Sequence, residues 1–374
     1  MNIIVVAASD TERDEARRLR WGDYWFKDSL CKALEAQGHT IVGAIDQADV
    51  IVNCHGPSIQ NLPPETYNVL WIIGHPDMVT PAECWQYDAV YAESAEFTEH
   101  LRGLGVECEH LSGASDFVPM DVAREPRAVF VGNWRPGRVL PATQYPLTVW
   151  GEGWPGHLPE GATLGGVEYA HADLNALYAS AEELPNQTHP DMEKWGMHNP
   201  RHYDILATRG EIVPTFAECA KRIMADVPCT RMMLDLGCGK QPRRGFIGVD
   251  RVGGTQVFEA DLEDGLTDFD AVDVIVADNL LEHVHNLIPL MNSCHEAMRP
   301  SGRMHITVPN AGKSLDAAFS DPTHVRVFTM STWDYFDGEH RRWQEYGQQY
   351  GILPWKVIYK RERDRFIDVM LRPA

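Results

Sequence analysis

The stretch Met232-Met-Leu-Asp-Leu-Gly-Cys-Gly-Lys240 carries the sharpest local pattern in this chain of 374 residues. Its apolar start predicts a buried β-strand that reaches Asp235, and Gly237 and Gly239 predict a tight turn directly after it. Because glycine has no Cβ, the backbone of such a turn can approach a ligand closely. The stretch therefore predicts a ligand site at the carboxyl end of a strand.

Further strands follow this turn at short spacing. Phe246-Ile-Gly-Val-Asp250 predicts a second strand, and an acidic residue at its tip can accept hydrogen bonds from both hydroxyls of a ribose. Asp261 follows a third short strand, and residues 272–277 predict a fourth. A helix expected at 287–298 and an apolar run ending at Pro309 continue the alternation. Strands that alternate with helices predict an α/β fold with a parallel sheet.

The order of these pieces, with Asp278-Asn-Leu-Leu-Glu-His-Val284 and Arg299-Pro-Ser-Gly302, resembles the class I S-adenosylmethionine-dependent methyltransferases. The likeness is to the small type with an L-E-H motif after strand four. It covers residues 229–374 and implies a class I methyltransferase sheet, a C-terminal β-hairpin and S-adenosylmethionine as the cofactor. The residues that it assigns to cofactor binding are Asp235, Gly237, Gly239, Asp250, Asp261, Leu262 and Asn279.

Two features depart from the family pattern. Lys240 and Gln241 stand where a third glycine is usual, and the first helix is nearly absent because Gly239 and Phe246 are only seven residues apart. We interpret this as a short-helix variant that keeps cofactor binding. The alternative is a nicotinamide-binding Rossmann site, but the turn lacks G-x-G-x-x-G and the L-E-H motif has no role there.

Methyl transfer to oxygen requires the acceptor hydroxyl to lose its proton, so a nearby histidine or carboxylate is the expected base. The candidates are His283 in the L-E-H motif, and Asp321 and His324 in the loop after strand five. For His283 the alternative is a structural role, in which it caps a helix or bonds the backbone. Asp321 and His324 together offer only two ligands, so we predict no metal site.

The front of the chain predicts two more α/β units. Residues 1–124 alternate short β-branched runs with helical patterns, which indicates a parallel sheet covered on both faces. Residues 125–228 open with Ala128-Val-Phe-Val-Gly-Asn133 and are expected to include a short strand at 211–214. The chain is therefore expected to be α/β throughout, with three Rossmann-like units at 1–124, 125–228 and 229–374.

Four stretches give the first two units a resemblance to the GT-B glycosyltransferases, in particular the spore-maturation branch. They are Trp21-Gly-Asp-Tyr-Trp-Phe26, Val69-Leu-Trp-Ile-Ile-Gly-His-Pro-Asp77, Phe130-Val-Gly-Asn-Trp-Arg135 and residues 184–210. The resemblance implies a nucleotide-sugar donor in a cleft between two lobes. It places Gly132, Asn133, Arg135, Asn186, Arg201 and Asp204 around the donor, with His75 and Asp77 as base candidates. The second lobe is short, and we expect it to lack the helix that crosses back to the first.

Charge and cysteine usage limit the partners and the compartment. The 33 Lys and Arg against 54 Asp and Glu give a net charge of −21, of which the first unit carries −12. This charge repels phosphate backbones and argues against nucleic acid as a partner. No run of about 18 apolar residues predicts a membrane span. Eight scattered cysteines without a C-x-x-C pair indicate a reduced, cytoplasmic protein.

These patterns predict an enzyme in which a methyltransferase is fused to a glycosyltransferase-like module that builds and O-methylates a glycan or glycosylated product. One alternative is a methyltransferase whose front half only holds a substrate or partner. Others are an enzyme that modifies nucleic acid and a non-enzymatic protein built on degenerate folds. The acceptor, a small molecule or a glycan, and the oligomeric state, including a homo-oligomer, stay open at the level of sequence.

Overall fold

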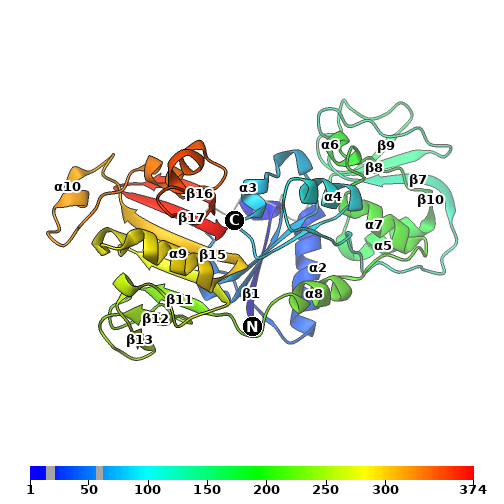
Figure 1. Cartoon of the computed structure of the whole chain (residues 1–374). Helices are drawn as coiled ribbons and strands as arrows, with labels where there is room; N and C mark the ends of the chain where they lie inside the picture. Colours follow the sequence, from blue (N-terminus) through cyan, green and yellow to red (C-terminus); the bar gives the residue numbers. More distant parts are fainter. Residues whose placement is uncertain (14–21, 56–61) are drawn as a thin grey trace. The chain divides into compact units, whose positions relative to one another are not determined.

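The computed structural model describes residues 1–13, 22–55 and 62–374, so Trp21 lies outside it (Figure 1). The chain forms two compact units, Met1–Leu62 with Thr66–Val227, and Pro228–Ala374 with Pro63–Glu65. Both units are α/β, as predicted, and they hold three separate sheets. Within the described residues, the structure contains no helix with the length and apolar character that a membrane span requires.

The first unit is built on a six-stranded, fully parallel sheet. In spatial order its strands are β2 (Thr40–Ile41), β1 (Asn2–Ala7), β3 (Val50–Cys54), β4 (Tyr67–Ile72), β5 (Ala89–Ala92) and β6 (Glu109–His110). The central strands are apolar and almost completely buried, because helices and loops cover both faces of a parallel sheet. The strand order reverses between β1 and β3, and ligands of open parallel sheets bind at the carboxyl ends beside such a reversal.

Two helices pack side by side on this sheet (Figure 1). In α2 (Gly22–Ala36), Phe26, Leu30 and Leu34 are buried at helical spacing against the strands. The second helix, α8 (Phe216–Ala225), begins in a capping box between Thr215 and Glu218. The remaining helices α3 (Pro81–Cys84) and α4 (Ala95–Gly103) connect β4, β5 and β6.

The position of α8 corrects the expectation that no helix crosses back to the first sheet. Phe216, Cys219, Ala220 and Ile223 join the buried core beneath α2, although they follow the second sheet in sequence. The ring of Phe216 lies 4.8 Å from that of Phe26. The amphipathic pattern of α8 predicts a buried face, but the surface that covers this face is set by tertiary packing.

A four-stranded parallel sheet completes the first unit. Its strands are, in order, β10 (Ala181–Glu183), β7 (Glu125–Val131), β8 (Leu147–Trp150) and β9 (Thr163–Gly166). The helices α5 (His171–Ser180), α6 (Pro190–Glu193) and α7 (Pro200–Thr208) follow β9 along the chain. The strand expected at 211–214 is wrong. These residues lie along the surface with Ile212 fully exposed, so neither burial nor pairing stabilises a strand there.

The second unit holds a seven-stranded sheet with one inserted antiparallel strand. In order the strands are β13 (Val257–Glu259), β12 (Ile247–Asp250), β11 (Met233–Leu236), β14 (Val272–Asp278), β15 (Met298–Pro309), β17 (Phe366–Pro373) and β16 (Trp355–Arg363). The predicted C-terminal hairpin is β16 with β17. Because β17 pairs between β15 and β16, the order differs from the 3-2-1-4-5-6 of dinucleotide-binding sheets.

One face of this sheet carries most of the core of the second unit. The helix α9 (Leu287–Ala297) buries Leu290, Met291 and Cys294 against it, and Trp333 and Trp355 are fully buried in the same cluster. Residues 237–246, all of them described, form turns and no helix, as the short spacing predicted. The short elements that shape the loops are η4 (Leu262–Asp264), η5 (Leu281–His283), α10 (Leu315–Phe319), η6 (Met330–Tyr335) and the π-helical turn η7 (Trp343–Gly347).

Candidate functional site

The predicted glycine turn lies at the carboxyl ends of β11 and β12. The Gly239 N–H donates to Asp250 Oδ2 over 2.8 Å, and the Val252 N–H donates to Asp250 Oδ1 over 2.9 Å. The Gly237 N–H donates to the Val249 carbonyl over 2.8 Å. Each carboxylate oxygen has two lone pairs, so Asp250 can still accept hydrogen bonds from a ligand. The turn thus holds an oriented, half-buried carboxylate at the edge of the sheet.

Gly237 and Gly239 have the same backbone conformation and different surroundings. Their φ angles are 69° and 63°, in the left-handed region that disfavours side chains. A Cβ on Gly237 would lie 2.7 Å from Leu280 Cδ1, whereas a Cβ on Gly239 would meet nothing within 4 Å. The open side of the turn is therefore at Gly239, beside Asp250.

Arg243 is a site residue that sequence reasoning missed. Its backbone N–H donates to Asp235 Oδ2 over 2.8 Å, its Nε lies 3.9 Å from Asp235 Oδ1, and its guanidinium pairs with Asp278. Burial raises the pKa of Asp235, while Arg243 opposes this shift. The signal was present in the departure from the family pattern, since Arg243 lies in the short loop that replaces the first helix.

The other predicted cofactor residues occupy different environments. Asp261 accepts the Glu263 N–H over 3.0 Å and caps η4, and Leu262 is buried in the core of the unit. Asn279 is exposed, has φ 49°, and donates its backbone N–H to the Thr307 carbonyl over 2.8 Å. A positive φ on a non-glycine residue directly after β14 is a local strain of the type that gathers at ligand sites.

The loop that contains Asp321 and His324 is bonded to the segment after β14. The Val325 N–H donates to the Glu282 carbonyl over 2.8 Å. Arg326 donates from Nε to the Val284 carbonyl over 2.9 Å and from Nη2 to the His285 carbonyl over 2.6 Å. These bonds bring His324 beside the L-E-H motif.

The rings of His283 and His324 are in edge-to-face contact, with centroids 4.7 Å apart and planes at 74°. Glu282 lies beside them, with Oε1 4.0 Å from His324 Nε2. Glu282 is 1% exposed and neither of its side-chain oxygens has a hydrogen-bond partner. Burial raises the pKa of Glu282 to about 7. Both histidines were predicted as base candidates, whereas Glu282 was named only as the neighbour of His283 in the L-E-H motif.

Asp321 contacts this group through Thr323. The Thr323 hydroxyl donates to Asp321 Oδ1 over 2.6 Å and lies 2.9 Å from His283 Nδ1. A hydroxyl has one proton, so His283 Nδ1 carries a proton and donates it to Thr323. The lone pair of His283 is therefore on Nε2, the atom that a base would use.

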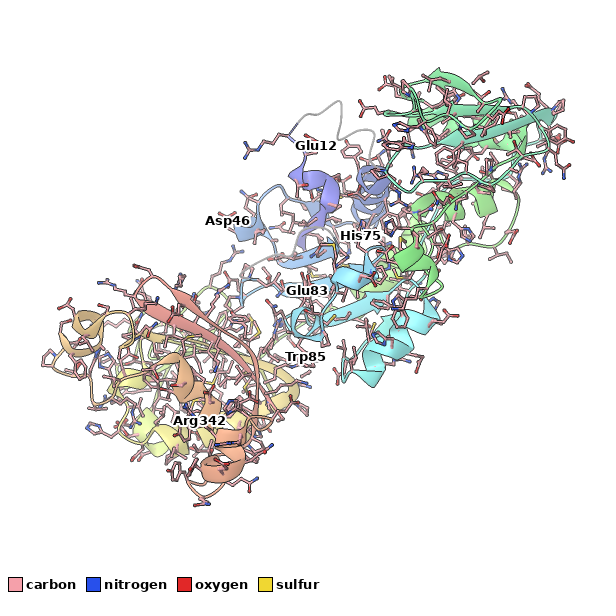
Figure 2. The ribbon with its side chains drawn as sticks, turned by 90° about the horizontal axis from the view of Figure 1, so that it is seen from above. Glu12, Asp46, His75, Glu83, Trp85 and Arg342 are labelled. Atoms are coloured by element: carbon pink, nitrogen blue, oxygen red, sulfur yellow. The ribbon has the colours of Figure 1, made fainter. Side chains whose placement is uncertain are left out.

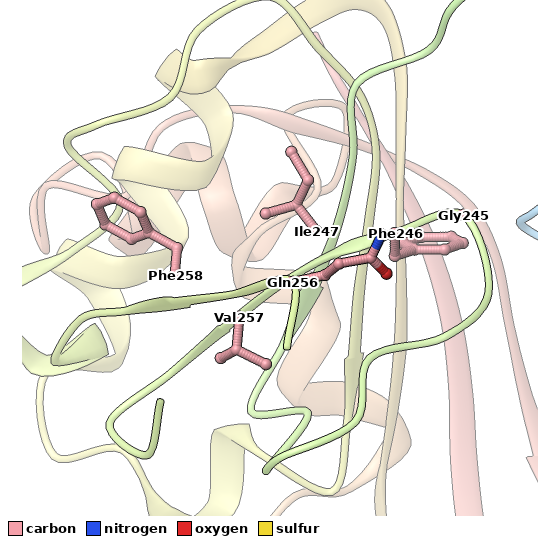
Figure 3. Close-up of a pocket in the computed structure, with 6 residues that line it drawn as sticks. All are labelled: Gly245, Phe246, Ile247, Gln256, Val257 and Phe258. Atoms are coloured by element: carbon pink, nitrogen blue, oxygen red, sulfur yellow. The ribbon is translucent and has the colours of Figure 1, made fainter. Parts of the chain in front are cut away.

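The second unit also has a cavity of about 450 Å³. It lies at the amino ends of the strands, whereas the glycine turn lies at their carboxyl ends, and Figure 3 shows the residues that line it. It is lined by Gly245, Phe246, Ile247, Gln256, Val257 and Phe258, at the amino ends of β12 and β13. None of the predicted site residues is among them, so this hollow is separate from the glycine turn.

The first unit contains a second candidate site, a cavity of about 750 Å³ at the carboxyl ends of both its sheets. Residues after β1, β3 and β4 line it together with residues after β7 and β8, so it includes the reversal point of the six-stranded sheet. Its aromatic walls include Trp25 stacked on His171 with ring centroids 4.2 Å apart, and Trp150 edge-on to Tyr169.

Three arginines line this cavity: Arg135, Arg138 and Arg201. Arg201 donates to the Val131 carbonyl over 2.8 Å and lies 4.4 Å from the centre of the Phe130 ring. Burial lowers the pKa of all three, and repulsion from the other two lowers that of Arg138 further, to about 9. Like charges held together in a partly buried cavity favour an anionic ligand.

The remaining predicted residues of this unit are placed as follows. Gly132 and Asn133 line the cavity, and a Cβ on Gly132 would lie 2.5 Å from Arg201 Nη2. Asn186 accepts from Arg201 over 2.9 Å. Asp204 lines the cavity, accepts from Ser115 over 2.6 Å, and has its pKa raised to about 6 by burial.

The two base candidates of the first unit differ in position. His75 lies at the turn after β4 with φ 49° and lines the cavity (Figure 2). Its Nδ1 is 4.0 Å from Asp191 Oδ2, and Asp191 also pairs with His189. Asp77, two residues later in η3 (Pro76–Met78), is exposed and is not among the lining residues.

Comparisons with known proteins give a partial likeness to methyltransferases. No protein-family model matches the chain, and neither does any curated protein. A SAM-dependent methyltransferase structure from Archaeoglobus fulgidus is 17% identical, with 41% of this chain and 90% of that chain covered and a TM-score of 0.27. An S-adenosylmethionine-dependent methyltransferase from Mesorhizobium loti is 16% identical, with 41% of this chain and 96% of that chain covered and a TM-score of 0.26. A TehB-like SAM-dependent methyltransferase from Corynebacterium glutamicum is 16% identical, with 49% of this chain and 98% of that chain covered and a TM-score of 0.27. Values this low carry no argument about activity.

Proposed function

We propose that residues 228–374 form an S-adenosylmethionine-dependent methyltransferase unit. The observation that carries the proposal is Asp250 held by the Gly239 N–H at the tip of β12, on the open side of the glycine turn. A carboxylate there can accept hydrogen bonds from both ribose hydroxyls, as acidic residues at the tip of strand two do in nucleotide-binding sheets. Gly237, Gly239 and Asp235 would then border the methionine part of the cofactor.

The acceptor would enter beside the L-E-H motif. In the reaction, the acceptor oxygen forms a bond to the methyl carbon, the bond from that carbon to sulfur breaks, and the hydroxyl proton goes to a base. His283 presents a lone pair on Nε2, since its Nδ1 is held by Thr323 and Asp321. His324 is in ring contact with His283, and Glu282 lies beside His324.

Isothermal titration of the full chain with S-adenosylmethionine tests the cofactor assignment. Asp250→Asn keeps the size of the side chain and removes its charge and one acceptor. We expect it to weaken binding about 10- to 100-fold, since a hydrogen bond to a charged group contributes about 1.5–3 kcal/mol. The matched control is Asp264→Asn, an exposed carboxylate in η4. Wild-type chain that fails to bind, or Asp250→Asn that binds like the control, contradicts the proposal.

A second function is favoured by the cavity of the first unit. We propose that this cavity binds a nucleotide-sugar through its diphosphate, because three arginines and an aromatic wall line one space of about 750 Å³. Guanidinium groups match phosphate geometry, and aromatic rings stack on bases. Such a ligand would supply a sugar to the acceptor, and the methyltransferase unit would then methylate a hydroxyl of the product, a glycan or glycosylated molecule.

Arg135→Ala tests this second function without removing a structural contact. Arg201 and Arg138 make hydrogen bonds to backbone carbonyls, whereas among the described residues the Arg135 guanidinium interacts through charge, with Asp191, Arg138 and Arg201. We expect UDP- or GDP-sugars to bind the wild type and to bind this variant at least 10-fold more weakly, with Arg124→Ala as an exposed control. Wild-type chain that binds no nucleotide-sugar at millimolar concentration contradicts the proposal. Binding without sugar transfer would identify the module as a substrate-holding scaffold.

A further inference from the structure

Two side chains of the L-E-H motif and one from the loop after β15 form a cluster with the donor types of a metal site. One ligand atom each from Glu282, His283 and His324 lies within 4.8 Å of the other two. Two of these residues are adjacent in sequence at η5, and the third is supplied by the loop that Val325 and Arg326 bond to this segment. The arrangement of two imidazoles and one carboxylate is a common donor set for divalent transition metals.

Hydrogen bonds fix both imidazoles in the tautomer that a metal requires. His324 Nδ1 lies 2.8 Å from the Ala318 carbonyl, which can only accept, so this nitrogen carries the proton. His283 Nδ1 donates to the Thr323 hydroxyl, which donates in turn to Asp321. Both rings therefore keep a lone pair on Nε2. Metal-binding histidines are held in this way, with the other ring nitrogen bonded to a carbonyl or a carboxylate.

Glu282 supplies the second, independent indication. Its side chain is only 2% exposed, yet neither oxygen has a hydrogen-bond partner. A buried carboxylate without partners costs several kcal/mol of solvation, so native structures normally satisfy it with donors or a cation. Glu282 Oε1 lies 4.0 Å from His324 Nε2, which is too far for a hydrogen bond. The space between these atoms is where a cation would satisfy all three.

We propose that Glu282, His283 and His324 bind one divalent first-row transition metal ion. Such ions take nitrogen and oxygen ligands at about 2.0–2.2 Å, which puts neighbouring ligand atoms about 3–3.5 Å apart. The distance of 4.0 Å between His324 Nε2 and Glu282 Oε1 needs a small contraction around the ion. Imidazole ligands favour manganese, cobalt, iron or zinc over magnesium, which prefers oxygen ligands.

Three protein ligands leave coordination positions open for water or an acceptor oxygen. If the methyltransferase proposal holds, on which this step rests, a hydroxyl bound there gives its proton to solvent water more readily, because the ion stabilises the alkoxide. His283 would then hold the metal rather than accept the proton. The metal site itself does not depend on that reaction.

The first experiment uses the full wild-type chain stripped with EDTA and titrated with Mn²⁺ in the absence of any other ligand. We expect the electron paramagnetic resonance signal of free Mn²⁺ to fall by one equivalent per chain, and Co²⁺ to give a visible spectrum distinct from that of the hydrated ion. A free Mn²⁺ signal equal to that in buffer, with an unchanged Co²⁺ spectrum, would overturn the proposal.

The second experiment compares variants in the same titration. Glu282→Gln and His324→Ala should each weaken Mn²⁺ binding at least 10-fold, and Thr323→Ala, which removes the partner of His283, should weaken it about 10-fold. The matched control is His285→Ala, because His285 lies in the same segment but pairs with Glu263. Unchanged binding in both ligand variants would overturn the assignment. Circular dichroism verifies that each variant is folded.

The two proposals for the second unit can fail separately. S-adenosylmethionine binding is measured on the metal-free chain, and metal binding is measured without S-adenosylmethionine. A chain that binds Mn²⁺ at one site but no cofactor contradicts the methyltransferase proposal and leaves the metal site. A chain that binds the cofactor but no metal supports the first proposal and leaves His283 as the base.

Discussion

Two glycines of one turn, Gly237 and Gly239, have nearly identical φ angles and are expected to respond differently to alanine. Both substitutions carry the same left-handed strain, about 1 kcal/mol. Only the Gly237 variant also forces a Cβ against Leu280, at 2.7 Å. We therefore expect Gly237→Ala to lower the free energy of unfolding by about 1 kcal/mol more than Gly239→Ala in urea denaturation.

For cofactor binding we expect the opposite order, with the larger effect from the substitution of Gly239. The Cβ of Gly239→Ala enters open space beside Asp250, where the proposed ligand would lie. Isothermal titration should show a larger loss of S-adenosylmethionine affinity for Gly239→Ala than for Gly237→Ala. Equal losses of affinity would mean that the cofactor does not approach this side of the turn.

Residues at the ends of strands were easier to predict from the sequence than residues whose partners lie far away in the chain. The positions of Asp250 and the glycines were predicted because they depend on local backbone conformation and on where a strand ends. Arg243 was missed and Glu282 was given no role of its own, since their surroundings depend on partners that are distant in sequence, such as Asp278 and His324. From the sequence, Asp321 and His324 were the only metal ligands considered, and they were judged too few. In the structure Asp321 accepts a hydrogen bond from the Thr323 hydroxyl.

At the scale of elements, α8 is the part whose place the sequence did not reveal. Ile223 is fully buried beneath α2, while Lys221 on the same helix is exposed. Ile223→Ala should destabilise the first unit by about 2–5 kcal/mol through lost burial and a cavity. Lys221→Ala should change the unfolding free energy by less than about 0.5 kcal/mol. Similar small effects of both substitutions in urea denaturation would mean that α8 is not part of this core.

The two sheets of the first unit are also joined by a buried carboxylate. Glu93 follows β5, accepts the His198 N–H over 3.0 Å and pairs with the Tyr203 hydroxyl. Burial is the main cause that raises the pKa of Glu93 to about 8, with Glu96 adding to the shift and the His198 N–H opposing it. This contact connects the six-stranded sheet to the segment that carries α7.

At the scale of the whole molecule, Glu93 makes stability depend on pH. Between its unfolded pKa of about 4.5 and the folded value, the native state binds more protons than the unfolded state, so the free energy of unfolding falls as pH rises. The loss should be about 2 kcal/mol between pH 5 and pH 7. Glu93→Gln should remove this slope, and parallel wild-type and variant curves in urea denaturation at several pH values would contradict the assignment.

Sequence patterns alone predicted the α/β class, the succession of strands along the second unit and the glycine turn with Asp250. These follow from local causes, namely apolar runs at strand length, glycine conformations and spacings too short for a helix. Tertiary packing determines which surface covers α8, which carboxylate lies beside the two histidines, and that three arginines line one cavity. Each of these depends on burial and charge brought together from distant parts of the chain, and no local pattern encodes them.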